Sequence, residues 1–148
     1  MDRFADDRLL HMPHGVLLSV EDSDSEYYVI KMALEEARIP IHLCRVSDGQ
    51  QALWFLQKTH GYELAPRPDL ILLNLNLPKK DGFEVLTEIQ ASELLRSIPV
   101  IVFTSSSLAT EKKKALALGA RDYIAKPGTL NGLIHALGSV CSQFLAES

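Results

Sequence analysis

Polar groups that could carry out chemistry stand directly after four separate apolar runs of this 148-residue chain. They are Glu21 and Asp22 after residues 16–20, Asn74 after 70–73, Thr104 after 100–103, and Lys126 after 123–125. If these runs are parallel strands, their carboxyl ends meet at one edge of a sheet, around residue 74. Two carboxylates, a hydroxyl and an ammonium there suit a Mg²⁺-dependent phosphoryl-acceptor site. Such a site needs a carboxylate nucleophile, so the amide of Asn74 departs from that chemistry.

The elements that must position these groups can be predicted from the apolar pattern. The predicted strands are 16–20, 41–46, 69–74, 98–103 and 123–124, and the predicted helices begin near residues 23, 47, 83, 110 and 130. Strands that alternate with helices form right-handed crossovers and a parallel sheet covered on both faces. We therefore predict an α/β fold, a doubly wound (βα)5 parallel sheet with strand order 2-1-3-4-5. Its switch point lies where Glu21, Asp22 and Asn74 fall.

Local signals add detail to this prediction. Ser23-x-x-Glu26 predicts a capping box at the first helix, and Ser47-x-x-Gln50 predicts the cap of the second. The polar residues His42 and Arg45 favour an edge position for the second strand. Gly119 is expected just beyond the fourth helix, where a left-handed conformation often ends a helix.

The segment 69–82, Asp-Leu-Ile-Leu-Leu-Asn-Leu-Asn-Leu-Pro-Lys-Lys-Asp-Gly, carries the most specific motif. Together with Glu21-Asp22, Thr104 and Lys126-Pro127, it resembles the receiver domain of two-component response regulators, and most of all the receivers that partner cyanobacterial phytochromes. The resemblance covers about residues 14–146, preceded by a tail, 1–13. It implies the flavodoxin-like receiver fold. It also implies that position 74 is normally the aspartate that accepts a phosphoryl group from a sensor histidine kinase.

The resemblance implies roles for the residues around position 74. Mg²⁺ would be bound by Asp22 directly, by Glu21 through water, by residue 74, and by the backbone carbonyl of Asn76. Pro78 and Gly82 would shape the loop that follows. An acidic pair alone is weak evidence, since Glu21 could simply solvate the start of the first helix.

Three further residues would act on the phosphoryl group or respond to it. Thr104 would bond a phosphoryl oxygen and act as a switch, although threonine is also common in strands. Lys126 would place its ammonium against the phosphoryl group and would pair with Asp22 in the empty site; the alternative is a surface lysine. Tyr123 matches the aromatic switch position, and a half-buried strand aromatic explains it almost equally well.

Asparagine at position 74 should remove ordinary phosphorylation, because an amide oxygen is a poor nucleophile. Mg²⁺ should bind more weakly, since one anionic ligand is lost. Repulsion among the acidic groups should fall, and the Asn74 amide could donate hydrogen bonds to Asp22 or Glu21.

The leading expectation is a single-domain receiver of a His-to-Asp phosphorelay, without enzymatic activity of its own, working with a sensor histidine kinase of the phytochrome type. The alternative is a pseudo-receiver that serves as a phosphorylation-independent interaction or dimerisation module. A small flavodoxin-like enzyme or nucleotide binder is disfavoured, because no glycine-rich phosphate loop follows the first strand.

Composition narrows the class of protein further. The net charge of -4 and pI of 5.7 disfavour a nucleic-acid-binding surface. No apolar run approaches the roughly 18 residues of a membrane span, and residues 1–13 lack the apolar core of a signal peptide. Cys44 and Cys141 are expected to be buried free thiols, which suits a cytoplasmic protein.

Self-association is a further expectation. Receivers of the kind this chain resembles often form homodimers through the fourth helix, fifth strand and fifth helix. Phe144 and Leu145 end the apolar stripe of the last helix, which would leave them in need of another surface. The alternative is that Phe144 folds back on the second helix or frays with the terminus.

Overall fold

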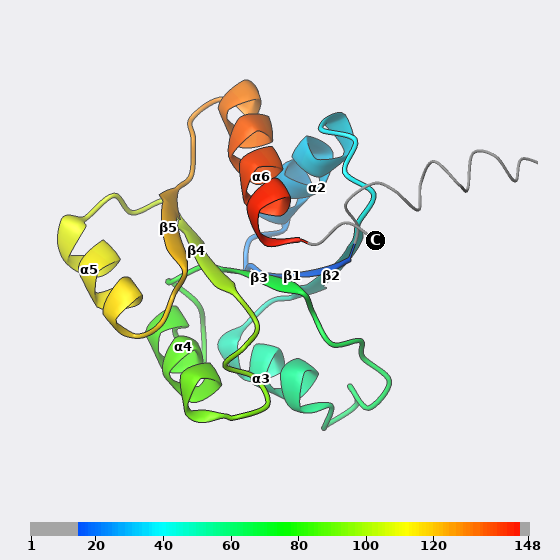
Figure 1. Cartoon of the computed structure of the whole chain (residues 1–148), viewed down its shortest axis with the longest axis vertical. Helices are drawn as coiled ribbons and strands as arrows, with labels where there is room; N and C mark the ends of the chain where they lie inside the picture. The colour runs from blue at the N-terminus through cyan, green and yellow to red at the C-terminus, as the bar shows by residue number, and fades with distance from the viewer. Residues whose placement is uncertain (1–14, 146–148) are drawn as a thin grey trace, which may run out of the picture.

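A five-stranded parallel sheet forms the centre of the computed structural model, which describes residues 15–145. Its strands are β1 (Val16–Val20), β2 (His42–Val46), β3 (Leu70–Leu73), β4 (Val100–Thr104) and β5 (Asp122–Ala125). They lie in the order β2-β1-β3-β4-β5, as predicted (Figure 1). The predicted tail, residues 1–13, and the outermost receiver residues, His14 and Ala146, lie outside the described part of the chain.

Helices cover both faces of the sheet, as a doubly wound fold requires (Figure 1). They are α2 (Asp24–Glu36), α3 (Gly49–Gln57), α4 (Gly82–Ala91), α5 (Ala109–Ala117) and α6 (Leu130–Phe144). Helices α2 and α6 pack on one face, and α3, α4 and α5 on the other. Within residues 15–145, no helix is both long enough and apolar enough to cross a membrane.

The continuous apolar runs form central strands because successive side chains point to opposite faces. In β3, Leu70 and Leu72 belong to the core under α2 and α6. Ile71 and Leu73, which alternate with them, belong to the core under α3 and α4. Each face of β3 is therefore buried, as expected of a central strand.

The predicted cap of α3 is wrong by one residue. Asp48 is the N-cap, and its Oδ1 accepts a hydrogen bond from the backbone N–H of Gln51 at 2.7 Å. Ser47 lies outside the helix, where its N–H and hydroxyl both donate to Gln51 Oε1. An Asp carboxylate is a strong N-cap acceptor, so the helix starts one position later than the Ser47 pattern indicates.

Two other local predictions are confirmed. Strand β2 lies at the edge of the sheet. Gly119 follows α5 with a φ of +108°, a conformation that glycine adopts without steric cost.

The end of α6 corrects the premise of the dimer expectation. Leu145 is only 5% exposed, and it packs with Phe144 into the core between α2 and α6. This core lies on one face of the sheet, whereas α3 packs on the other. Phe144 therefore does not fold back on α3, the second predicted helix. The last helix therefore buries its apolar end within its own chain and needs no second surface for it.

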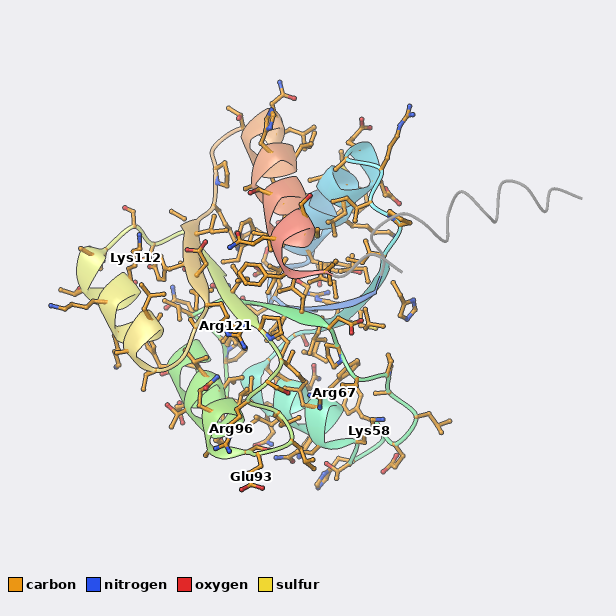
Figure 2. All side chains as sticks on the ribbon, viewed as in Figure 1. Lys58, Arg67, Glu93, Arg96, Lys112 and Arg121 are labelled. Atoms are coloured by element: carbon orange, nitrogen blue, oxygen red, sulfur yellow. The ribbon has the colours of Figure 1, made fainter. Side chains whose placement is uncertain are left out.

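Both cysteines are free thiols, but only Cys141 is buried, and Cys44 is half-buried. Burial raises the pKa of the Cys141 thiol to about 11. The lysines 112–114 on α5, of which Figure 2 labels Lys112, are all exposed, as expected for a solvated helix face. Lys114 reaches back over the Phe83 ring, with its Nζ 4.3 Å from the ring centroid.

Candidate functional site

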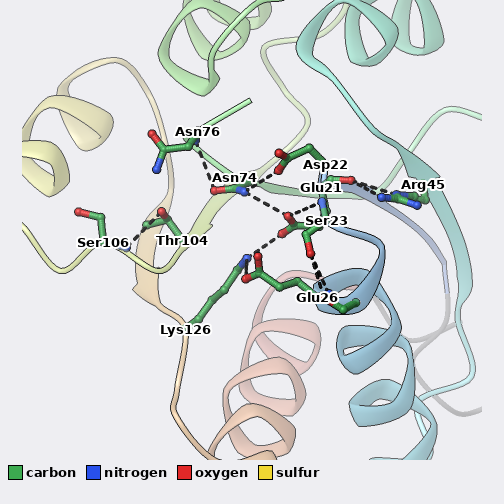
Figure 3. A network of polar contacts seen from close by, with 11 residues as sticks. Glu21, Asp22, Ser23, Glu26, Arg45, Asn74, Asn76, Thr104, Ser106 and Lys126 are labelled. Atoms are coloured by element: carbon green, nitrogen blue, oxygen red, sulfur yellow. Dashed lines mark hydrogen bonds and ion pairs between the residues drawn. The ribbon is translucent and has the colours of Figure 1, made fainter. Parts of the chain in front are cut away.

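The strand register brings the predicted site residues to one edge of the sheet. Val20 of β1 lies opposite Leu73 of β3, so Glu21 and Asn74 start their loops side by side. On the other side of β3, the Lys126 N–H donates to the Thr104 carbonyl at 2.7 Å and closes the end of the β4–β5 pair. Four loops thus meet where sequence and topology place the switch point (Figure 3).

Asn74 is buried at the centre of this edge, and its amide is oriented by its neighbours. Its Nδ2 donates to Glu21 Oε2 at 3.2 Å and to Asp22 Oδ1 at 3.4 Å, as Figure 3 shows. Its Oδ1 accepts from the backbone N–H of Asn76. The opposite orientation would face an amide oxygen toward two carboxylates, which is unfavourable. A neutral hydrogen-bond donor therefore faces the acidic pair where an aspartate would add a third negative charge.

Lys126 does not pair with Asp22, and that prediction is wrong. Its Nζ lies 2.7 Å from Glu21 Oε1 and 2.7 Å from Glu26 Oε1. The Glu21 side chain is 2% exposed and turns inward toward the ammonium, whereas Asp22 is exposed and receives the Asn74 amide. Burial of Glu21 makes a charged partner necessary, and Lys126 supplies it.

The start of α2 corrects the predicted capping box. Ser23 is the N-cap as predicted, and its Oγ accepts from the Glu26 N–H at 3.3 Å. The reciprocal bond is absent among the described residues, because the Ser23 N–H donates to Glu21 Oε2 at 3.2 Å instead. The Glu26 carboxylate is thereby released toward Lys126.

Thr104 and Tyr123 both contact the same loop residue. The Thr104 hydroxyl is fully buried and accepts from the Ser106 N–H at 3.3 Å. The Tyr123 ring is 7% exposed, and its hydroxyl donates to the Ser106 carbonyl at 3.0 Å. The structure thus connects the two predicted switch residues through Ser106, and their switch roles stay predictions.

Sequence reasoning missed three supporting residues. Arg45 donates to the Glu21 carbonyl through Nε and Nη2 (Figure 3). It also pairs with Asp24, and together these contacts fix the turn between β1 and α2. Its only sequence signal was a charge in an apolar strand. Glu26 was taken for part of a capping box, and Ser106 was not singled out.

Glu21 and Asp22 fit a hydrated divalent cation rather than a fully protein-bound one. Within the described part of the chain, no group of three or more His, Cys, Asp or Glu residues is arranged so that it could hold a metal ion. Mg²⁺ retains several waters and needs only one or two carboxylates, so two acidic side chains are a sufficient donor set. The Asn74 amide nitrogen lies against both of them and would have to turn away.

Comparison with known proteins gives one consistent result. The family described as "Response regulator receiver domain" matches residues 17–138. Response regulator Rcp1 from Synechocystis sp. is 39% identical over 133 residues, which cover 90% of each chain.

Two solved structures are similar to this chain in fold. The Mn(2+)-bound form of Rcp1 has a TM-score of 0.81 at 38% identity, covering 90% of this chain and 96% of Rcp1. The phosphorylated cyanobacterial phytochrome response regulator RcpA has a TM-score of 0.82 at 36% identity, covering 88% and 94%.

Proposed function

Because the chain belongs to the response regulator receiver family, we propose that it is a receiver of a His-to-Asp phosphorelay in which Asn74 has removed ordinary phosphorylation. Its relation to Rcp1 and RcpA supports a phytochrome-type sensor histidine kinase as the upstream partner. It acts by binding other proteins rather than as an enzyme. The two free thiols are consistent with the reducing cytoplasm as its compartment.

The observation that carries this proposal is the position of the Asn74 amide. It stands at the end of β3, within hydrogen-bond distance of both carboxylates of the acidic pair. The surrounding groups are those of a phosphoryl acceptor, and the nucleophile alone is missing. Phosphoryl transfer to the chain and to its Asn74→Asp variant tests the proposal directly.

A second candidate function is favoured by the same amide. Its nitrogen donates to Glu21 and Asp22, and its oxygen accepts from Asn76, so the site is internally satisfied without metal or phosphate. A pseudo-receiver of this kind would hold one conformation and bind its partner constitutively. Its partner affinity would be the same before and after phosphorylation of the Asn74→Asp variant, which equilibrium binding measurements can establish.

Metal affinity provides a prediction that does not depend on phosphorylation. Mg²⁺, held by Glu21 and Asp22 with the Asn76 carbonyl, should bind this chain about tenfold more weakly than the Asn74→Asp variant, because a unit charge near the cation is lost. Asp22→Ala should weaken binding in both backgrounds. Isothermal titration calorimetry measures each affinity.

Asp24→Ala is the matched control, since Asp24 is a nearby carboxylate that pairs with Arg45 instead of facing Asn74. It should leave the Mg²⁺ affinity almost unchanged. Equal affinities of the chain and its Asn74→Asp variant would remove residue 74 from the metal site.

We also propose that the chain forms a homodimer through the face of α5, β5 and α6. Exposed leucines support it rather than the end of α6: Leu116 in α5, Leu130 in α6, and Leu108 at the N-cap of α5. We expect a dimer in sedimentation velocity at micromolar concentration, and Leu116→Glu should convert it to a monomer by placing a charge in the interface. A monomeric unmodified chain would contradict the dimer.

A further inference from the structure

The position of Lys126 depends on two carboxylates rather than on close packing. Its side chain is 13% exposed, and its Nζ lies 2.7 Å from both Glu21 and Glu26. One side of Lys126 faces an apolar cavity of about 240 Å³, lined also by Val29 and Phe103. On that side the Nζ lies 5.9 Å from the Phe103 ring centroid, so the two ion pairs at 2.7 Å are its closest contacts.

Glu26 is released for this contact by an unusual helix start. The same Asp/Ser-x-x-Glu pattern occurs at α4, where Glu84 accepts from the Asp81 N–H and Asp81 accepts from the Glu84 N–H. At α2 the N–H of the N-cap residue, Ser23, donates to Glu21 Oε2 instead, so the Glu26 carboxylate does not cap the helix. The two helices thus begin with similar sequences, but Glu84 caps its own helix whereas Glu26 accepts a hydrogen bond from Lys126.

The hydrogen bonds of Glu21 show what Glu26 adds to the surroundings of the Lys126 ammonium. Glu21 is already engaged on both oxygens, by Lys126 on Oε1 and by Asn74 and Ser23 on Oε2. Glu21 therefore provides Lys126 with a buried partner beside residue 74, and Glu26 provides a second, half-exposed partner on α2. Within the described residues, Lys126 Nζ has no hydrogen bond to Asn74.

We propose that Glu26 is a positioning residue that holds the Lys126 ammonium toward α2 and restrains its movement to a group bound at residue 74. Movement toward residue 74 keeps the ammonium near Glu21 but breaks the contact with Glu26. Removal of Glu26 should therefore make Lys126 more available. The consequence for a phosphoryl group rests on the proposed function, whereas the restraint of Lys126 does not.

Trace acetylation of the folded, full-length chain with acetic anhydride tests the restraint without any phosphoryl chemistry. Mass spectrometry would give the labelling of Lys126 relative to exposed Lys112. Glu26→Gln should raise this ratio about two- to fivefold, the range expected for a partly exposed ion pair. Asp24→Asn, which removes a charge from the same helical turn but contacts Arg45, should leave it unchanged.

Glu26→Asp keeps the charge but shortens the reach by one methylene, so it should behave like Glu26→Gln. An unchanged ratio in Glu26→Gln, a wild-type ratio in Glu26→Asp, or an equal rise in Asp24→Asn would each overturn the restraint. Circular dichroism of every variant ensures that labelling reports a folded chain.

A second measurement links the restraint to residue 74. Glu26→Gln in the Asn74→Asp background should accelerate phosphorylation by acetyl phosphate about two- to fivefold, as Lys126 is released from a contact of this strength. If the labelling of Lys126 rises but the rate of phosphorylation does not change, the link between the restraint and residue 74 is overturned. If Asn74→Asp accepts no phosphoryl group while labelling responds as expected, the proposed function fails and the restraint of Lys126 stands.

Discussion

Incubated with Mg²⁺ and acetyl phosphate, the Asn74→Asp variant should take up one acid-stable, base-labile phosphoryl group, and the unmodified chain should take up none. The new carboxylate oxygen attacks phosphorus, the bond from phosphorus to the acetate oxygen breaks, and acetate leaves with the electron pair. Asn74 cannot do this, because its neutral amide oxygen is a weak nucleophile. Radiolabelling or intact mass spectrometry measures the uptake.

Two controls make this result specific to position 74. Asn74→Ala should remain unlabelled, and peptide mapping should place the label of the Asn74→Asp variant at that residue. Peptide mass also reveals any spontaneous deamidation of Asn74 to Asp in the unmodified chain. Labelling of position 74 in a chain that has not deamidated would refute the proposal, and so would an Asn74→Asp variant that folds but never labels.

Gly82→Ala should lower the free energy of unfolding by about 2–3 kcal/mol, the upper part of the range for an overpacked site, because the clash is with backbone atoms. A Cβ added there would lie 2.6 Å from the Asn74 carbonyl oxygen and 2.7 Å from the Leu75 Cα. Gly82 also donates its N–H to the Leu75 carbonyl at 2.8 Å, which holds α4 against the end of β3. Chemical denaturation measures the loss.

Gly138→Ala is the matched control for this substitution. A Cβ at Gly138 in α6 would meet no atom within 4 Å. Alanine should therefore stabilise the chain there by about 0.5–1 kcal/mol, because glycine is a poor helix residue. Equal effects of the two substitutions would show that the close approach of Gly82 to β3 does not matter.

Much of the fold could be predicted because the signals are strong and local. Continuous apolar runs such as Leu70–Leu73 identify strands buried on both faces, and their alternation with helices leaves few possible topologies. The topology then places the ends of β1 and β3 together, so Glu21, Asp22 and Asn74 could be assigned to one edge from the amino-acid sequence alone. The resemblance to receivers of cyanobacterial phytochromes is confirmed by the family match and by Rcp1 and RcpA.

The pairing of side chains within that edge could not be predicted, because several acceptors compete for each donor. Glu21, Asp22 and Glu26 were all candidate partners of Lys126. It pairs with Glu21, which is buried, and with Glu26, whose carboxylate does not cap the helix, whereas Asp22 accepts from Asn74. The α3 cap failed for a similar reason, since Ser47 and Asp48 are both good caps and only tertiary packing selects one. A sequence pattern specifies which groups are present but not how they share hydrogen bonds.

The contacts of the candidate site join residues that are far apart along the chain. The bond between Asn74 and Glu21 spans 53 residues, and the one between Lys126 and Glu21 spans 105. Contacts of such separation require long stretches of chain to be brought together, at a cost in loop-closure entropy. No local segment of the chain can assemble this constellation by itself. The site should therefore appear in refolding experiments together with the complete sheet, which would make it a reporter of global folding.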